Sequence, residues 1–110
     1  MRAFNSKVIA FLAPPWGDAL TAESGLDLGR TKPPIRKIVA DFEAACPNSP
    51  ILYAIEVHER LAPEPLADLR SEFLWSELEM FEVGGPTGRH GILLAGRRWP
   101  EPRRSGELGP

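Results

Sequence analysis

Hydrophobic positions gather in short runs that are separated by segments rich in proline and glycine. The run Lys7–Ala13 is almost continuous and contains β-branched and aromatic residues, and Ile51–Val57 has the same character. Runs of this kind are typical of strands that are buried on both faces of a parallel sheet. Pro14 ends the first run, because proline offers no N–H to a strand ladder. The pattern therefore predicts two buried strands.

The segment between these two strands has a different period. Its apolar residues recur at helical spacing, at Ile35, Ile38, Val39, Phe42 and Cys46. Pro33-Pro34 suits a first helical turn, and Pro47-Asn48-Ser49-Pro50 ends the pattern. A helix is therefore expected over 33–46. Residues 14–32, which precede it, are expected to form a long irregular loop, and loops of this length are often functional.

The second half of the chain predicts a short helix and a hairpin. The helix begins at Pro63-Glu64-Pro65, and Glu77–Val83 alternates as a half-buried strand does. His90–Gly96 is another apolar run, and glycines at 84, 85 and 88 lie between the two, so these strands form an antiparallel hairpin. The strand–helix–strand units imply parallel pairing. The result is an α/β domain with about half of a typical sheet.

Composition limits the class of protein. The chain has 110 residues, 43% of them hydrophobic and 25% charged, as in one small globular domain. That domain is expected over 1–99, and the segment 100–110 reads as a disordered tail. No apolar run approaches the roughly 18–20 residues of a membrane helix. The single cysteine, Cys46, excludes an internal disulfide framework. A cytoplasmic protein that does not enter a membrane is expected.

Charge is unevenly distributed along the chain. The net charge of −2 combines an acidic segment at 54–83 with basic segments at 1–37 and 84–110. This distribution excludes a polybasic nucleic-acid binder that neutralises many phosphates. The basic residues near the two ends of the chain have two interpretations, a solvated surface or a functional patch.

The segment Ala13-Pro14-Pro15-Trp16-Gly17 carries the candidate chemistry. It follows the first predicted strand, and ligands in open α/β sheets bind outside the carboxyl ends of strands. The two prolines hold the backbone extended, so that the preceding carbonyls point into the crevice. Trp16 offers a flat surface on which a planar substrate stacks, and Gly17 lets the chain turn beside it.

A strand that ends in Pro-Pro-Trp-Gly resembles the fourth motif of class I S-adenosylmethionine-dependent methyltransferases that modify amino groups of bases. It is most similar to the Ser-Pro-Pro-Trp-Gly form of the trimethylguanosine synthase group, which are RNA cap guanine-N2 methyltransferases, and of their bacterial relatives. The resemblance covers about residues 6–99. It implies a Rossmann-like class I methyltransferase sheet, C-terminal half only, with strands four to seven. His90–Gly96 is then strand seven, antiparallel and inserted between strands five and six.

The resemblance implies direct methyl transfer from S-adenosyl-L-methionine, without a metal, to an amine of RNA or a nucleotide. By this analogy Ala13, Pro14, Pro15 and Trp16 form the catalytic motif. The Pro14 carbonyl orients the target amine, and Trp16 stacks on the base. Ala13 lacks the side-chain acceptor that the family has at this position. Arg30 and Lys32, in the loop that follows, join Trp16 and Gly17 as substrate-binding residues that meet phosphate, unless the loop is merely solvated.

The cofactor-binding half of such an enzyme has no counterpart in the sequence. In the family the cofactor sits on a glycine-rich loop after strand one, and an acidic residue after strand two binds its ribose. Only twelve residues precede Ala13, and the glycines at 84–88 lie between hairpin strands. The resemblance therefore implies the C-terminal half of a methyltransferase, inactive alone: a truncated gene, a late start codon, or one half of a split enzyme that a complementing N-terminal half completes. The alternative is a non-catalytic remnant or interaction module whose exposed 8–12 edge pairs with a partner or forms a homodimer.

The histidines and the other tryptophans are interpreted more plainly. His58 is either a general base or a surface histidine in an acidic stretch, and the second interpretation is favoured. His90 is expected to be structural or exposed. Two histidines 32 positions apart with no nearby thiolate predict no metal site. Cys46 and Trp75 are expected in the core, and Trp99 is expected to close the end of the last strand.

Overall fold

The chain forms a small α/β domain with a mixed sheet of four strands and two helices. A computed structural model describes residues 6–82, 84 and 88–102. Its elements, in chain order, are β1 (Val8–Leu12), the 3-10 helix η1 (Gly17–Ala19), β2 (Leu20–Thr21), β3 (Gly25–Leu26), α1 (Ile35–Ala45), β4 (Ile51–His58), α2 (Pro63–Arg70), β5 (Ser76–Met80) and β6 (His90–Arg97). The predicted α/β class and the predicted order of the main elements are confirmed.

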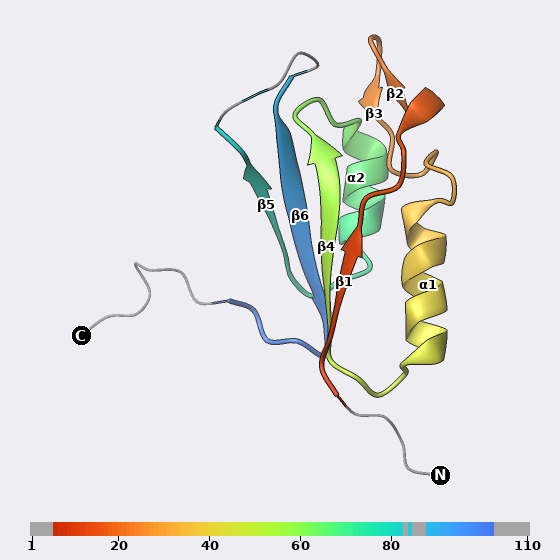
Figure 1. Ribbon diagram of the computed structural model, residues 1–110, viewed down its shortest axis with the longest axis vertical. Coiled ribbons are helices and arrows are strands. Elements are labelled where there is room, and N and C mark those ends of the chain that lie inside the picture. The colour runs from red at the N-terminus through yellow and green to blue at the C-terminus, as the bar shows by residue number, and fades with distance from the viewer. Residues whose placement is uncertain (1–5, 83, 85–87, 103–110) are drawn as a thin grey trace, which may run out of the picture.

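The four long strands lie in the order β1-β4-β6-β5 (Figure 1). β1 pairs with β4 in parallel, and β6 runs antiparallel to both β4 and β5. The last strand along the chain therefore lies between the two strands that precede it, as expected. Since β1 has no neighbour on its other side among the described residues, it forms one free edge of the sheet.

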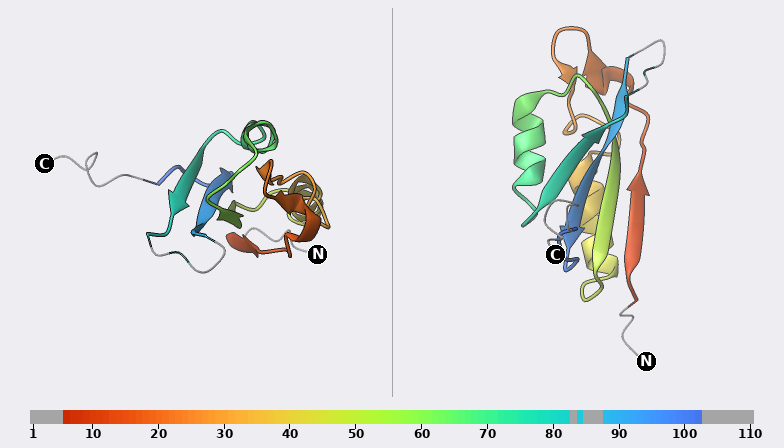
Figure 2. Two further views of the ribbon diagram at one scale, coloured as in Figure 1. Left: turned by 90° about the horizontal axis from the view of Figure 1, so that it is seen from above. Right: turned by 90° about the vertical axis from the view of Figure 1, so that its left-hand side faces the viewer.

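Both helices cover the same face of the sheet (Figure 2). Alternate strand residues point toward them and form the core, with Ala10, Leu12, Ile51, Tyr53, Ile55, Leu93 and Ala95 all less than 7% exposed. From the helices, Ile35, Val39 and Leu69 complete this core. The Tyr53 hydroxyl donates a hydrogen bond to the carbonyl of Val39 at 3.4 Å, which ties β4 to α1.

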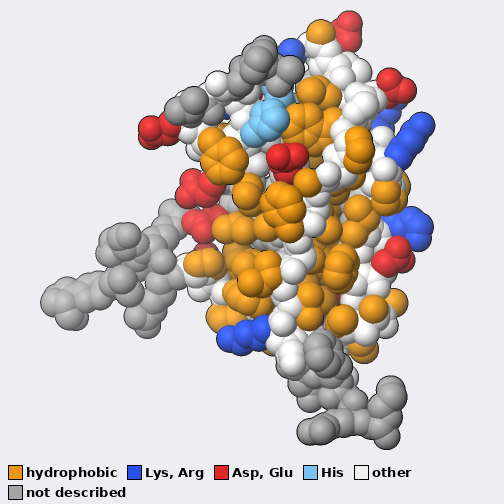
Figure 3. All heavy atoms as spheres, viewed as in Figure 1, with side chains coloured by type: hydrophobic (Ala, Val, Ile, Leu, Met, Phe, Trp, Pro, Cys, Tyr) orange, Lys and Arg blue, Asp and Glu red, His pale blue; other side chains and the backbone are white. Residues whose placement is uncertain are grey.

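The opposite face of the sheet, called the open face here, carries no helix among the described residues. Ile9 and Phe11 on β1 are 68% and 61% exposed there. Figure 3 looks onto this face and shows hydrophobic side chains across its middle. The expectation that the apolar runs are buried on both faces is thus wrong. Right-handed crossovers from β1 through α1 and from β4 through α2 place both helices on one side.

Part of the segment 14–32 has regular structure, which corrects the expectation of an irregular loop. η1 follows the Pro-Pro-Trp segment, and β2 pairs antiparallel with β3. Leu26 in β3 is fully buried, and its N–H donates to the carbonyl of Arg60 at 2.7 Å. The Ala62 N–H donates in turn to the carbonyl of Leu26 at 2.9 Å. The small β2–β3 unit is therefore fixed to the connection between β4 and α2.

Three single-residue expectations are also corrected. His58 is 3% exposed, so it is not a surface histidine. Cys46 follows the last turn of α1 and is only partly buried, although it packs against the core as expected. Trp75 is partly buried and lies over Gly96, and its Nε1–H donates to the carbonyl of Trp99 at 2.7 Å.

Two expectations fall largely outside the described residues. Of the predicted tail, only residues 100–102 are described, and they have no regular structure. Most of the predicted turn at 84–88 is also outside. Among the described residues no helix is long and apolar enough to cross a membrane.

Candidate functional site

A pocket of about 380 Å³ opens beside the segment that follows β1. It is lined by Pro15, Trp16, Gly17, Asp18, Arg30 and Lys32. The structure therefore brings together Trp16, Gly17, Arg30 and Lys32, the four residues expected to bind substrate. Ala13 and Pro14 do not line this pocket, although they lie directly before it in the chain. We call this cavity the Trp16 pocket.

One wall of the Trp16 pocket is a tight turn after β1. Gly17 has a φ of +48°, a left-handed conformation that glycine adopts readily. The turn is closed by the Ala19 N–H, which donates to the carbonyl of Trp16 at 2.8 Å. Ala19 is 2% exposed, and its own carbonyl accepts from the N–H of Asp27 at 2.8 Å. The buried alanine thus anchors the turn that presents Trp16 and Gly17.

The facing wall is a loop that a buried threonine anchors to the interior of the domain. Thr31 is 1% exposed, and its hydroxyl donates to the carbonyl of Pro33 at 2.9 Å. Its neighbours on either side, Arg30 and Lys32, are exposed. Because the residue between them is anchored in the interior, both cationic side chains remain at the surface and reach the pocket.

The Trp16 indole also contacts two imidazoles. Its ring centre lies 5.8 Å from that of His58 and 5.0 Å from that of His90. His58 ends β4 and His90 begins β6, and the antiparallel register pairs them directly. The two histidines therefore hold one position of the indole at the carboxyl end of the parallel strands.

The protonation pattern at His58 is set by the backbone. Its Nδ1 accepts a hydrogen bond from the Arg60 N–H at 3.0 Å, so in the neutral ring the proton lies on Nε2. The adjacent Glu59 is held by Arg89 at 2.9 Å, and this hydrogen bond lowers the pKa of the Glu59 carboxyl. Glu59 is thus the ion-pair partner of Arg89.

The charge of the Trp16 pocket is suited to an anion next to a planar group. Arg30 and Lys32 contribute two positive charges, and Asp18 contributes one negative charge. Within the part of the chain that the structure describes, neither cation takes part in an ion pair. Their N–H groups are therefore available to a phosphate, which arginine and lysine both bind.

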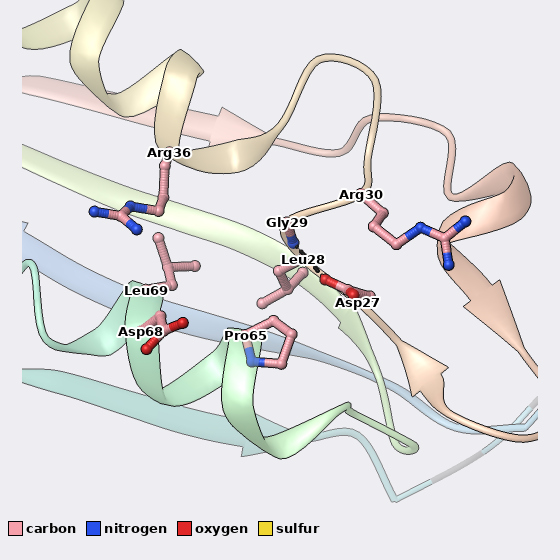
Figure 4. Close-up of a pocket in the computed structure, with 8 residues that line it drawn as sticks. All are labelled: Asp27, Leu28, Gly29, Arg30, Arg36, Pro65, Asp68 and Leu69. Carbon is pink, nitrogen blue, oxygen red and sulfur yellow. Dashed lines mark hydrogen bonds between the residues drawn. The ribbon is translucent and has the colours of Figure 1, made fainter.

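A second pocket, of about 270 Å³, lies between the same loop and the two helices (Figure 4). It is lined by Asp27, Leu28, Gly29, Arg30, Arg36, Pro65, Asp68 and Leu69. Arg30 lines both pockets. We call this second cavity the helix-side pocket.

The described residues do not fit an S-adenosylmethionine site. Such a site needs a glycine-rich turn between a strand and a helix. The turn before α1 instead ends in Pro33 and Pro34, and α2 begins at Pro63 behind Ala62. No group of three or more histidine, cysteine, aspartate or glutamate side chains in the described part could hold a metal ion.

Comparison with known proteins gives no further identification. No family model matches the chain, and no curated protein or solved structure matches it either.

Sequence reasoning missed two features of the site. The first is the contact of both histidines with Trp16, although one histidine ends a strand and the other begins an antiparallel one, which indicates a shared end of the sheet. The second is the helix-side pocket, where Arg36 and Asp68 come from different helices. No local pattern indicates that meeting, because it depends on how α1 packs beside α2.

Proposed function

We propose that this chain is the acceptor-binding part of a class I S-adenosylmethionine-dependent methyltransferase that modifies a guanine amino group of RNA or of a nucleotide. The observation that carries the proposal is the Trp16 pocket. Pro15, Trp16 and Gly17, from the segment that follows β1, form one wall. Arg30 and Lys32, which form no ion pair among the described residues, line the same pocket.

The sheet supports the same assignment. The order β1-β4-β6-β5, with an antiparallel β6 between β4 and β5, is the order that the resemblance implies for the second half of a Rossmann-like methyltransferase sheet. In such sheets ligands bind at the carboxyl ends of the parallel strands, where Trp16 lies.

The pocket residues divide the recognition of a nucleotide between them. The Trp16 indole provides a surface for the base, and Arg30 and Lys32 bind its phosphate. We assign the target amine to the carbonyl of Pro14, which does not line the pocket but lies directly before it in the chain. By the resemblance, this carbonyl accepts a hydrogen bond from the amine and turns the nitrogen lone pair toward the methyl donor. Since Ala13 has no polar side chain, this carbonyl is the acceptor at the motif and fixes the amine alone.

The methyl donor is S-adenosyl-L-methionine, which supplies an electrophilic methyl group when it is bound. The described residues do not hold it, so we assign its binding to a complementing N-terminal half that adds a strand beside β1. The chain alone is then inactive in RNA modification. A cytoplasmic location is part of the same proposal.

Titration of the purified chain with guanosine 5′-monophosphate tests the acceptor site. Base stacking on an aromatic residue contributes about 1–3 kcal/mol. Trp16→Ala is therefore expected to weaken binding roughly 5- to 150-fold, and Trp16→Phe is expected to retain most of it. Trp99→Phe, away from the pocket, is the matched control. Binding that is absent, or that is equal in the wild type and in Trp16→Ala, contradicts the proposal.

A second candidate function is supported by the open face. Ile9 and Phe11 are highly exposed on an edge strand, whereas the other edge, β5, carries Glu77 and Glu79 in the register of the open face. Charged residues protect an edge against pairing, and β1 has none within its bounds. The chain is then a non-catalytic interaction module that pairs β1 with a partner chain.

Sedimentation velocity separates the two functions. An interaction module that self-associates through β1 sediments as a dimer, and Phe11→Glu returns it to the monomer. Leu74→Glu is the control, because Leu74 is fully exposed and lies outside the strands. A wild-type chain that is monomeric and binds guanosine 5′-monophosphate supports the methyltransferase assignment instead.

A further inference from the structure

We propose that the helix-side pocket binds the nucleoside next to the target base, so that the substrate has at least two linked nucleotides and Arg30 binds the phosphate between them. The inference rests on the proposed function of the Trp16 pocket. It extends that function by naming a second binding site and a minimum length for the substrate.

The position of Arg30 carries the first step. Arg30 lines both pockets, so the two cavities adjoin at this residue. The backbone that carries it is well fixed, because the Arg30 N–H donates to the carbonyl of Asp27 at 3.0 Å and Thr31 is buried. A phosphodiester that joins two nucleosides also lies between them. Arg30 is therefore placed to meet that phosphate, with one nucleoside on each side.

The lining of the helix-side pocket carries the second step. Its floor is apolar, since Leu28 and Leu69 are 2% and 1% exposed and Pro65 lies beside them (Figure 4). Such a floor suits the face of a base. Asp27 and Asp68 add carboxylates at the rim, and carboxylates accept hydrogen bonds from ribose hydroxyls and from base N–H groups.

The free acceptors in this pocket are specific oxygens. Asp27 uses its Oδ1 to accept from the Gly29 N–H at 2.8 Å, which leaves Oδ2 for a ligand. No ion pair of the Asp68 carboxylate occurs among the described residues. Arg36 is held by Glu72 at 2.8 Å and so stands as a fixed donor at the same end as Asp68.

The same lining disfavours a second phosphate. The charge of Arg36 is already paired with Glu72, and the carboxylates of Asp27 and Asp68 repel a phosphate, so the pocket does not simply continue a track of phosphates. Its volume of about 270 Å³ lies just below the usual range for drug-sized ligands, so one ring system with its sugar fills it. A single nucleoside is the ligand that matches both the charge and the size.

Calorimetry with three guanine nucleotides tests the proposal. The probes are guanosine 5′-monophosphate, guanosine 3′,5′-bisphosphate and the 5′-phosphorylated dinucleotide pGpG. The bisphosphate provides the second phosphate without the second nucleoside. We expect pGpG to bind the wild-type chain at least about tenfold more tightly than the bisphosphate, as hydrogen bonds to a charged group allow.

Two variants show which pocket contributes to the binding of each probe. Asp68→Asn keeps the volume of the side chain and is expected to weaken pGpG about tenfold while leaving the two mononucleotides unchanged. Trp16→Ala is expected to weaken all three probes. Equal binding of pGpG and the bisphosphate overturns the inference and leaves the Trp16 site intact, and so does an Asp68→Asn variant that binds pGpG normally. If none of the probes binds, the proposed function itself fails.

Discussion

A glycine that holds the site loop in place gives the most quantitative prediction. Gly25 begins β3 with a φ of +78°, and a Cβ built on it lies 2.7 Å from the carbonyl oxygen of Arg60. That carbonyl accepts the Leu26 N–H, which fixes β3 and the loop that carries Arg30. Gly25→Ala therefore adds a strained backbone conformation and pushes β3 away from its partner.

The size of the effect follows from these two terms. A left-handed conformation costs a residue with a Cβ about 1–2 kcal/mol. Displacement of β3 also weakens the two backbone hydrogen bonds that Leu26 makes, each of which contributes about 0.5–1.5 kcal/mol. Gly25→Ala is thus expected to lower the free energy of unfolding by about 2–4 kcal/mol, a large fraction of the stability of a domain of this size.

Gly17 provides the matched control. Its φ is +48°, but a Cβ built there meets nothing within 4 Å. Gly17→Ala therefore carries only the backbone cost, about 1–2 kcal/mol. Urea unfolding followed by circular dichroism measures both variants, with an unchanged m-value as the test that the same surface is exposed. Equal losses in the two variants refute the argument that contact with Arg60 makes Gly25 necessary.

Three further predictions concern the rest of the fold. Burial, and secondarily the charge of Glu43, raise the pKa of Tyr53 to about 12. Because Tyr53 is the only tyrosine, the absorbance of tyrosinate after a rapid pH jump should report this pKa in the folded chain. The contribution of the Tyr53 hydroxyl to the free energy of unfolding is fully present below pH 10 and is lost as the pH rises toward 12. Arg98→Ala removes two hydrogen bonds to backbone carbonyls besides its ion pair, so denaturant unfolding should show a loss of about 1–3 kcal/mol, against less than about 1 kcal/mol for Glu43→Gln. Gly96→Val places a side chain against the ring of Trp75, so the near-ultraviolet circular dichroism spectrum should change. The free energy of unfolding should fall by about 1–3 kcal/mol. An unchanged spectrum contradicts this packing.

The main elements were predictable because each depends on a local pattern. Proline at 33 and 34 and apolar residues at helical spacing located α1, which spans Ile35–Ala45. Alternation predicted the end of β5 less accurately, because the alternating sequence pattern continues to Val83, whereas the ladder with β6 ends at Met80. The Phe81 N–H still donates to the carbonyl of His90 at 2.9 Å, so the end of the ladder depends on the path of both strands, which the sequence of β5 alone does not contain.

The features that were missed depend on distant residues. β2 and β3 have two residues each, too few for any period, and they exist because buried Leu26 bonds to the connection after β4. His58 is buried because its register partner is His90 and because Trp16 packs against both. The candidate residues of the Trp16 pocket were predictable, since they follow one strand, but the sharing of Arg30 between two pockets required the fold.

Calorimetric titration of the chain with two ligands, guanosine 5′-monophosphate and S-adenosylhomocysteine, tests the central claim most directly. The account predicts that the guanine nucleotide binds and that Trp16→Ala weakens its binding, because we propose that the Trp16 pocket binds the methyl acceptor. It predicts no heat from S-adenosylhomocysteine, because we assign the cofactor to a complementing half. Micromolar binding of S-adenosylhomocysteine to the chain alone, or no binding of the nucleotide, contradicts the account.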